Sequence, residues 1–475
     1  MANSLVLAIT IICFLVLTTG GSAFRQRPQL PQQEQQAQYC RIQSLNPLES
    51  ARRIQHEAGY TDVWDQTSDQ IQCAGVAASR HLIQQGGLLL PSFNNAPLLA
   101  YVVRGRGIVG IINPGCAETF QSSEQTESGE RFGSERFRDQ HQKIHPCRKG
   151  DIVAFQAGVA HWVHNDGNEE LELMVVHDTS NADNQLDQNL RVTNTRFFLA
   201  GSPQESEKQQ TKYGGQQEEI FSGNLFQGFE TEVLAESFKV DLETAARLQG
   251  QDDNRGFIVR VGKEFEMQRP SKYEDERRER SQRNNGFEET VCTMRIRENL
   301  DDPERADVYT AQGGRISTVN SHNLPILKQI QLSAERGVLY ENAMAAPHWT
   351  LNAHNIIYIL RGSGRIQVVG HSNRAVFNGE VRQGQLLVVP QNYAEVKQAG
   401  SEGLEWVSFK TNDRAVSSPL AGKTSVIRAM PEEVVMSAFR VSRAEAHKLK
   451  YNRQEVRIFP QSSSKREKGS RWSIV

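Results

Sequence analysis

Short apolar runs separated by glycine-rich turns follow one another along most of this chain, and the same order of runs occurs twice. Runs of this length bounded by Gly and polar residues are typical of strands in an antiparallel protein. The matching pairs are 98–107 with 355–364, 150–155 with 384–389, and 171–176 with 404–409. A helix-like segment closes each copy, at 225–248 and at 431–449. The repeat predicts a mainly β fold of two barrels, at about residues 40–250 and 286–450, each with a short helical segment.

Polar tracts interrupt this pattern, at residues 25–38, 121–142, 204–219 and 271–283. The tract 271–283 is dense in Glu and Arg and contains no aliphatic residue. Because such a tract cannot bury enough apolar surface to offset the entropy lost on ordering, we expect it to be solvated.

The dipeptide Asn285-Gly286 follows this tract and precedes a strand-like run at 290–296. Asn-Gly suits a type I′ hairpin turn. It is also a peptide bond that a protease can reach, because Gly has no Cβ and the preceding residues are polar. The dipeptide alone leaves both interpretations open.

The first 23 residues predict a secretory signal peptide. They contain no charged side chain, have an apolar core at 5–17, and end in small residues, so we expect cleavage between Ala23 and Phe24. The apolar run is too short for a membrane anchor. With 54 Lys and Arg against 56 Asp and Glu, the chain is nearly neutral, and no long basic run indicates nucleic-acid binding.

The sequence from Asn285 through Phe287-Glu288-Glu289 to Cys292 resembles the processing junction of legumin-type (11S) seed storage globulins. The resemblance implies cleavage after Asn285 by an asparaginyl endopeptidase, giving an acidic chain (24–285, with the charged linker 271–285) and a basic chain (286–475). The charges agree with this division. From Gly286 onward there are 25 Lys and Arg against 19 Asp and Glu, and before it 29 against 37.

The first copy also contains a stretch similar to the second conserved motif of the cupin superfamily. The motif positions are Gly150, Gly158, His161 and Asn165, with Gln156 where the family has Pro. In the second copy Gly384 and Pro390 keep the register, while Asn392, Glu395 and Ala399 replace Gly, His and Asn. The resemblance covers nearly the whole chain after the signal peptide and implies jelly-roll barrels of the cupin type.

Cupin enzymes bind a metal through three His and one carboxylate. Aligned on Gly105, the first copy places Pro91, Phe93 and Leu98 at three of these positions and retains only His161. The second copy, aligned on Gly362, offers the set His348, Thr350, Asn355 and Glu395. Neither set reaches the ligands that a tight transition-metal site needs, so we expect no metal, cofactor or catalysis. The pair His141 and His145 lies in a polar insert without an acidic third ligand.

Five cysteines remain after removal of the signal peptide, and an odd number leaves one unpaired. Spacing alone cannot fix the pairing. The resemblance to legumins implies an intrachain bridge Cys40–Cys73 and an interchain bridge Cys116–Cys292, which leaves Cys147 as the free thiol.

The resemblance therefore predicts a seed storage protein that holds amino acids for germination. It implies passage through the endoplasmic reticulum to the protein storage vacuole. It also implies homo- or hetero-oligomers with other 11S subunits, trimeric as precursor and hexameric when mature. The alternatives are a metal-dependent bicupin enzyme of the oxalate-degrading kind and a bicupin that binds a sugar or another small ligand.

Overall fold

The structure is a computed structural model whose described residues begin at Ile42. The described residues are 42–64, 68–115, 144–186, 196–201, 221–250, 252–262, 265, 294–371 and 374–460. The predicted sites at Ala23, Phe24, Cys40, Cys116, His141, Asn285, Gly286 and Cys292 lie outside these ranges. No helix within them is long and apolar enough to cross a membrane.

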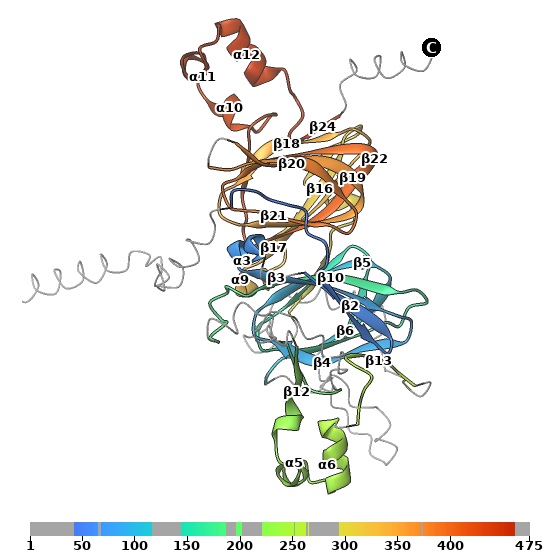
Figure 1. The fold of residues 1–475 in the computed structure, drawn as a ribbon. Coiled ribbons are helices and arrows are strands. Elements are labelled where there is room, and N and C mark those ends of the chain that lie inside the picture. The colour runs from blue at the N-terminus through green and yellow to red at the C-terminus, as the bar shows by residue number, and fades with distance from the viewer. Residues whose placement is uncertain are drawn as a thin grey trace, which may run out of the picture. The chain divides into compact units, whose positions relative to one another are not determined.

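The first half of the chain contributes most strands of two sheets, which are antiparallel except for the parallel pair β11 and β12 (Figure 1). The first runs in the order β1-β2-β3-β10-β5-β8-β14, and the second in the order β12-β11-β4-β9-β6-β7 with β13 beside β4. The strands are β1 (Arg52–His56), β2 (Gly59–Val63), β3 (Val76–Ile83), β4 (Gly87–Asn94), β5 (Leu98–Arg104), β6 (Arg106–Ile112), β7 (Ile144–Arg148), β8 (Asp151–Phe155), β9 (Ala160–His164), β10 (Leu171–Asp178), β11 (Arg196–Phe198), β12 (Phe221–Asn224) and β13 (Ile258–Arg260).

The second half repeats this arrangement with fewer, longer strands. The central order is β15-β16-β17-β22-β18-β23, and β19 pairs with β20, β21 and β22. The strands are β15 (Val308–Thr310), β16 (Gly314–Val319), β17 (Ser333–Leu339), β18 (Met344–Thr350), β19 (Asn355–Val369), β20 (Ala375–Arg382), β21 (Leu386–Val389), β22 (Ala394–Lys410), β23 (Ser417–Pro419) and β24 (Ile458–Phe459). The predicted fold class, mainly β with two cupin-type jelly rolls, is confirmed, although the sheets do not close into complete barrels.

Each half carries a pair of short helices where the sequence predicts one helix-like segment (Figure 1). They are α5 (Thr231–Phe238) and α6 (Leu242–Gln249) in the first half, and α11 (Glu432–Phe439) and α12 (Arg443–Tyr451) in the second. Lys239 and Arg440 break the segments, because both adopt the left-handed conformation with φ of 54°. Asp241 and Ser442 then cap the second helix of each pair through their side-chain oxygens. The predicted repeat therefore extends into the helices.

The two halves exchange short segments of chain. Strand β14 (Arg297–Asn299) follows the predicted junction in sequence, yet it pairs with β8 of the first half. In return, Leu48 forms a β-bridge with Leu386 of β21 in the second half. The strand predicted at 290–296 is wrong in its described part, because 294–296 lie outside any strand and pairing starts only at Arg297.

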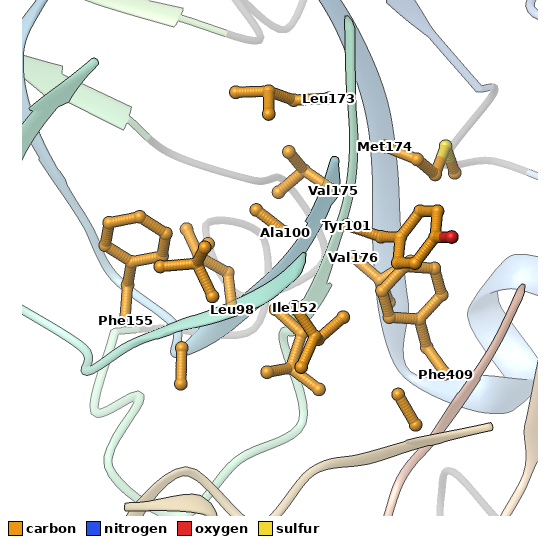
Figure 2. Packing of buried hydrophobic residues seen from close by; sticks show 14 of the residues in the cluster. Leu98, Ala100, Tyr101, Ile152, Phe155, Leu173, Met174, Val175, Val176 and Phe409 are labelled. Atoms are coloured by element: carbon orange, nitrogen blue, oxygen red, sulfur yellow. The ribbon is translucent and has the colours of Figure 1, made fainter. Parts of the chain in front are cut away.

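One hydrophobic cluster joins both halves, with Tyr101 of β5 and Phe409 of β22 among its members (Figure 2). A reciprocal polar contact lies beside it. Arg80 of β3 donates to the Tyr358 hydroxyl at 3.2 Å, and Arg336 of β17 donates to the Tyr101 hydroxyl at 3.1 Å. The two arginines occupy equivalent places in the repeat, and so do the two tyrosines. Each half therefore donates a hydrogen bond from its arginine to the tyrosine of the other half.

Candidate functional site

The centre of each half is lined by buried side chains from two directly paired strands. In the first half, Ser92 of β4 lies opposite His161 of β9. In the second, His348 of β18 lies opposite Glu395 of β22. All four residues are buried. These are the positions at which a cupin enzyme holds its metal, so the two centres are the candidate sites.

The sequence alignment is wrong by one residue in the first half. Pro91 and Phe93 are only half-buried, and Phe93 stacks on Phe197 with ring centroids 5.0 Å apart. The inward residues are Ser92 and Asn94 instead. The cause is a loop-length difference. Three residues join β4 to β5, whereas four join β18 to β19, so counting back from the turn glycine shifts the register.

The other predicted positions lie where the alignment puts them. Leu98 and Asn355 open the equivalent strands β5 and β19, and both are buried, as is Thr350. His145 lies in strand β7 and not in a polar insert, while His141 lies outside the described residues.

The turn before each centre requires a left-handed backbone conformation, which explains the residue at one motif position in each half. Gly158 has a φ of 73°, and its counterpart Asn392 has a φ of 66°. Asn is one of the few residues with a side chain that tolerates this left-handed conformation. The motif residue Asn165 is structural, because its side-chain amide donates to the carbonyl oxygens of Ile83 and Glu169.

In the first half an arginine lies against the remaining motif histidine. The Nδ1 of His161 is 3.1 Å from the carbonyl oxygen of Val159, so Nδ1 carries the proton and donates it. Its Nε2 is 3.3 Å from a terminal nitrogen of Arg196, which is fully buried and also donates through Nε to Ser92 at 2.8 Å. The guanidinium therefore meets the nitrogen that a metal would use.

This arginine is surrounded by neutral imidazoles. Burial and the charge of Arg196 lower the pKa of His161 to about 3 and that of His177 to about 3. The same causes lower the pKa of His56 to about 4 and hold that of His81 well below its usual range. Burial also lowers the pKa of Arg196 to about 10, which leaves it charged at neutral pH. Among the described residues, the first centre thus places the charged guanidinium of Arg196 against neutral imidazole rings.

In the second half a lysine occupies the centre. The Nζ of Lys397 lies 2.9 Å from Oε2 of Glu395 and 5.2 Å from the ring centroid of Trp406. The Nε2 of His348 lies 3.3 Å from the other oxygen of Glu395, and Asn355 donates to that same oxygen at 2.8 Å. Although burial alone would raise the pKa of Glu395, the charge of Lys397 keeps it below its ordinary value.

A second ion pair lies nearby in the same interior. The Nζ of Lys410 is 3.0 Å from Oε2 of Glu335, and Arg457 approaches the same oxygen at 3.7 Å. Burial opposes ionisation of Glu335, but Lys410 and then Arg457 hold its pKa well below the usual range. The second half is therefore filled by paired charges.

Neither centre fits the metal that the superfamily implies. Within the described ranges, no group of three or more His, Cys, Asp or Glu side chains could hold a metal ion. Basic groups lie against the would-be ligands instead. Sequence reasoning missed both Lys397 and Arg196. The alternation of β22 could have revealed Lys397, since it lies two residues from Glu395 on the same face. No local signal marks Arg196.

Two cysteines lie in the described part of the chain. Cys73 is disulfide-bonded, and its partner lies outside the described residues. Cys147 of β7 is free and only 2% exposed, and burial together with Asp151 raises its pKa to about 12. The pairings Cys40–Cys73 and Cys116–Cys292 stay predictions.

Comparisons with known proteins give concordant results over most of the chain. A family model described as Cupin matches residues 45–205 and 298–447. An 11S globulin seed storage protein of Anacardium occidentale is 49% identical, covering 95% of this chain and 98% of that protein. Cocosin 1 of Cocos nucifera is 46% identical, covering 97% of this chain and 98% of that protein. The solved structure of recombinant pro-11S globulin of pumpkin has a TM-score of 0.76 at 45% identity, covering 89% of this chain and 100% of that one.

Proposed function

This chain belongs to the 11S globulin family of seed storage proteins, and from this premise we propose that it is a nutrient reservoir without catalytic activity, cut once after synthesis and stored as an oligomer. The storage role itself follows from near-full-length identity of 46–49% to two proteins named 11S globulin seed storage protein. We propose that it is stored in the protein-storing compartment of the seed, which its similarity to seed storage globulins supports. The proposed route to that compartment is the secretory pathway, entered through a signal peptide cut between Ala23 and Phe24.

The observation that supports the absence of catalysis is the filling of both cupin centres. Arg196 lies against His161 in the first half, and Lys397 against Glu395 in the second. A metal ion at either place would meet a buried positive charge at close range, which is strongly unfavourable in a low-dielectric interior. The bicupin-enzyme alternative therefore has no observation in its favour.

Metal analysis tests this proposal directly. Protein purified without chelators should contain no stoichiometric manganese, iron, zinc or copper, and it should not turn over oxalate. His161→Ala should leave the metal content unchanged. One tightly bound transition metal per half, together with oxalate turnover, would replace the storage-only proposal with an enzymatic one.

The proposed processing gives two disulfide-linked chains. Cys292 is the only cysteine after Gly286, so a bridge between the products has to use it, and we propose Cys116 as its partner. Protein from mature tissue should run as one band unreduced and as two bands reduced, with amino termini near Phe24 and at Gly286. A single reduced band would show that no cleavage occurs.

The proposed oligomer is supported by apolar surface on the helical pairs. Phe238 ends α5 and Phe439 ends α11, and their exposed fractions are 53% and 49%. Val233 and Val434 are equivalent residues of the same helices and are also exposed. Exposed apolar patches of this kind mark protein–protein contacts. One chain carries two similar helical pairs, α5–α6 and α11–α12. We propose that α5–α6 of one subunit contacts α11–α12 of the next subunit, and that three such contacts close a trimeric ring. Two such rings then form the mature hexamer.

A further inference from the structure

The dipeptide Asn-Gly occurs at two places in this sequence, Asn285-Gly286 and Asn378-Gly379. The second lies in strand β20, on the carboxyl side of the proposed cut. Asn378 is exposed, and its side-chain oxygen accepts a hydrogen bond from Nε of Arg365 at 2.9 Å. An endopeptidase that recognises Asn followed by Gly therefore meets the same two residues on the surface of the second half.

Strand pairing closes this second dipeptide in the folded protein. The cleft of a protease takes an extended segment whose backbone groups are free to bind the enzyme. Strand β20 is instead paired with β19, where Asn378 lies opposite Gln367 and Gly379 lies opposite Ile366. The peptide bond therefore becomes a substrate only when β20 leaves β19, which is a local unfolding event.

Side-chain packing holds β20 only weakly. Among the described strands, β19 alone pairs with it, so β20 is an edge strand. Only Val376 and Val381 of its eight residues are buried. Segments with few buried apolar contacts open at a lower free energy than the whole domain. The opening of β20 therefore does not require the second half to unfold.

An arm from the first half, residues 45–49, contacts both ends of β20. The backbone N–H of Leu45 donates to the carbonyl oxygen of Val376 at 2.8 Å. Near the other end, the guanidinium of Arg382 donates to Oε1 of Glu49 at 3.0 Å. A β-bridge to β21 anchors the arm between these two contacts. The arm therefore opposes the departure of β20 from the sheet.

On the basis of the processing proposed above, we propose that Asn378-Gly379 is a second, closed site of the same endopeptidase, and that release of the arm 45–49 opens it. Cleavage there is hydrolysis of the peptide bond by one water molecule, which leaves a carboxylate on Asn378 and an ammonium group on Gly379. The arm belongs to the proposed acidic chain and β20 to the basic chain. The basic chain is thus kept intact during storage and becomes degradable once the acidic chain has been removed.

Treatment of the precursor with purified asparaginyl endopeptidase tests this proposal, with the new amino termini identified by sequencing. Within the time that cuts Asn285 completely, wild type should stay uncut at Asn378. Glu49→Lys places a positive charge against Arg382, and it should raise the cleavage rate at Asn378, which follows the population of open strand, about threefold. Leu45→Pro removes the N–H that binds β20 and should raise this rate at least about tenfold.

The matched control is Glu57→Lys, which makes the same change of charge on an exposed residue that accepts a hydrogen bond from Arg260 of the first half. It should be cut as wild type is. Adding Asn378→Gln to Glu49→Lys should abolish the second cut. Equal rates at Asn378 in wild type, Glu49→Lys and Leu45→Pro would overturn the proposal, as would rapid cleavage at this site in wild type.

Thermal melting followed by circular dichroism shows whether Leu45→Pro still folds. If it does not, Glu49→Lys carries the test, because its change lies at the surface. Wild type in urea gives a second measurement, since cleavage at Asn378 should accelerate below the global unfolding transition, and acceleration only together with global unfolding would overturn the proposal. Absence of the cut at Asn285 would contradict the proposed processing, whereas arm variants that are cut no faster at Asn378 would contradict only this inference.

Discussion

The reactivity of the free thiol of Cys147 cannot be predicted from its neighbours in the sequence alone. Arg148 and Lys149 follow it and favour a reactive thiolate if the sulfur is exposed. The structure places the side chain inside the first half, where it is 2% exposed and has a pKa raised to about 12 by burial. The basic neighbours therefore do not activate it, because alternation along β7 directs Cys147 inward.

Because it is buried, the thiol of Cys147 should not react with thiol reagents in the native protein. A thiol reagent should titrate almost nothing under native conditions and about one group per chain after denaturation without reductant. Cys147→Ser, the matched control, should lower the denatured value to near zero. If the denatured wild type gives no thiol, then Cys147 is bridged and the predicted pairing is wrong.

Some residues of the two cupin centres can be predicted from the sequence, and others cannot. His161 and Glu395 are found from the motif, because the turn before each of them keeps its glycine or asparagine. His348 is found by counting back from Gly362. Ser92 is missed because a one-residue loop difference shifts the register. Lys397 and Arg196 are missed for another reason. Both are basic residues, whereas a search for metal ligands considers His, Cys, Asp and Glu.

At the scale of elements, the helical pairs repeat as faithfully as the strands. Their positions follow from the sequence, but the break in each pair does not, because Lys239 and Arg440 are not residues expected at φ of 54°. The equivalent buried residues Leu234 and Val435 hold each first helix against the protein. The exposed side chains of the same helices, among them Phe238 and Phe439, form the surface proposed for contact with another subunit.

The exposed phenylalanines predict where assembly can be broken. Phe238→Glu or Phe439→Glu should leave the thermal melting point of the isolated chain nearly unchanged, because each side chain is about half exposed. Placing a carboxylate in an apolar contact costs about 2 kcal/mol or more, so association should weaken at least about thirtyfold. Analytical ultracentrifugation of the precursor measures the shift from trimer toward monomer.

Glu243→Ala on α6 is the matched control for these variants, because this side chain is 84% exposed. It should remain trimeric. If both phenylalanine variants also stay trimeric at micromolar concentration, the helical pairs are not the subunit contact.

The buried histidines of the first half predict acid sensitivity. His56, His161 and His177 have pKa values of about 4, 3 and 3 in the folded protein, against about 6.5 when unfolded. At a pH between the folded and unfolded pKa values, the histidines are protonated in the unfolded chain but remain neutral in the folded protein. The free energy of unfolding is therefore greatest above pH 6.5 and falls as the pH drops toward 4, by about 1.4 kcal/mol per pH unit for each histidine.

His177→Gln tests this slope, because an amide oxygen can accept the hydrogen bond that Asn94 donates to the ring at 2.8 Å. Urea unfolding at pH 7, 6 and 5 should give a dependence on pH that is shallower than in wild type by about 1.4 kcal/mol per unit. The paired carboxylates Glu335 and Glu395 do not interfere, because their contribution is lost only below the unfolded pKa of 4.5. An unchanged slope would show that His177 is not a source of the acid sensitivity.

At the scale of the whole molecule, the repeat in the sequence gives two β halves but not the way they are joined. Periodicity identifies strands from local patterns, whereas the pairing of β14 with β8 and of Leu48 with Leu386 joins segments far apart in sequence. The crossed contacts of Arg80 and Arg336 with the two tyrosines are equally nonlocal. These exchanges tie the proposed acidic and basic chains together without a covalent bond.

The same exchange fixes both ends of the segment that contains the predicted cleavage point. Strand β13 pairs with β4 before the segment, and β14 pairs with β8 after it, so residues 261–296 begin and end on the first half. In the uncut precursor, the described residues on both sides of the charged tract 271–283 are therefore held on the first half. In the proposed assembly two trimers meet at this region, and an interface core tends to exclude charged residues. We expect the tethered tract to oppose the docking of two trimers.

Cleavage after Asn285 frees one end of the tract while β14 keeps the new amino-terminal segment in place, so docking of trimers should follow the cut by mass action. Exposed to the endopeptidase, wild-type precursor should become hexameric in analytical ultracentrifugation, whereas Asn285→Gln should stay uncut and trimeric. Asn284→Gln is the matched control, because it retains Asn285-Gly286 and should be cut and form hexamers as wild type does. Hexamers from uncut Asn285→Gln would mean that the tract does not oppose docking, and that cleavage serves some purpose other than assembly.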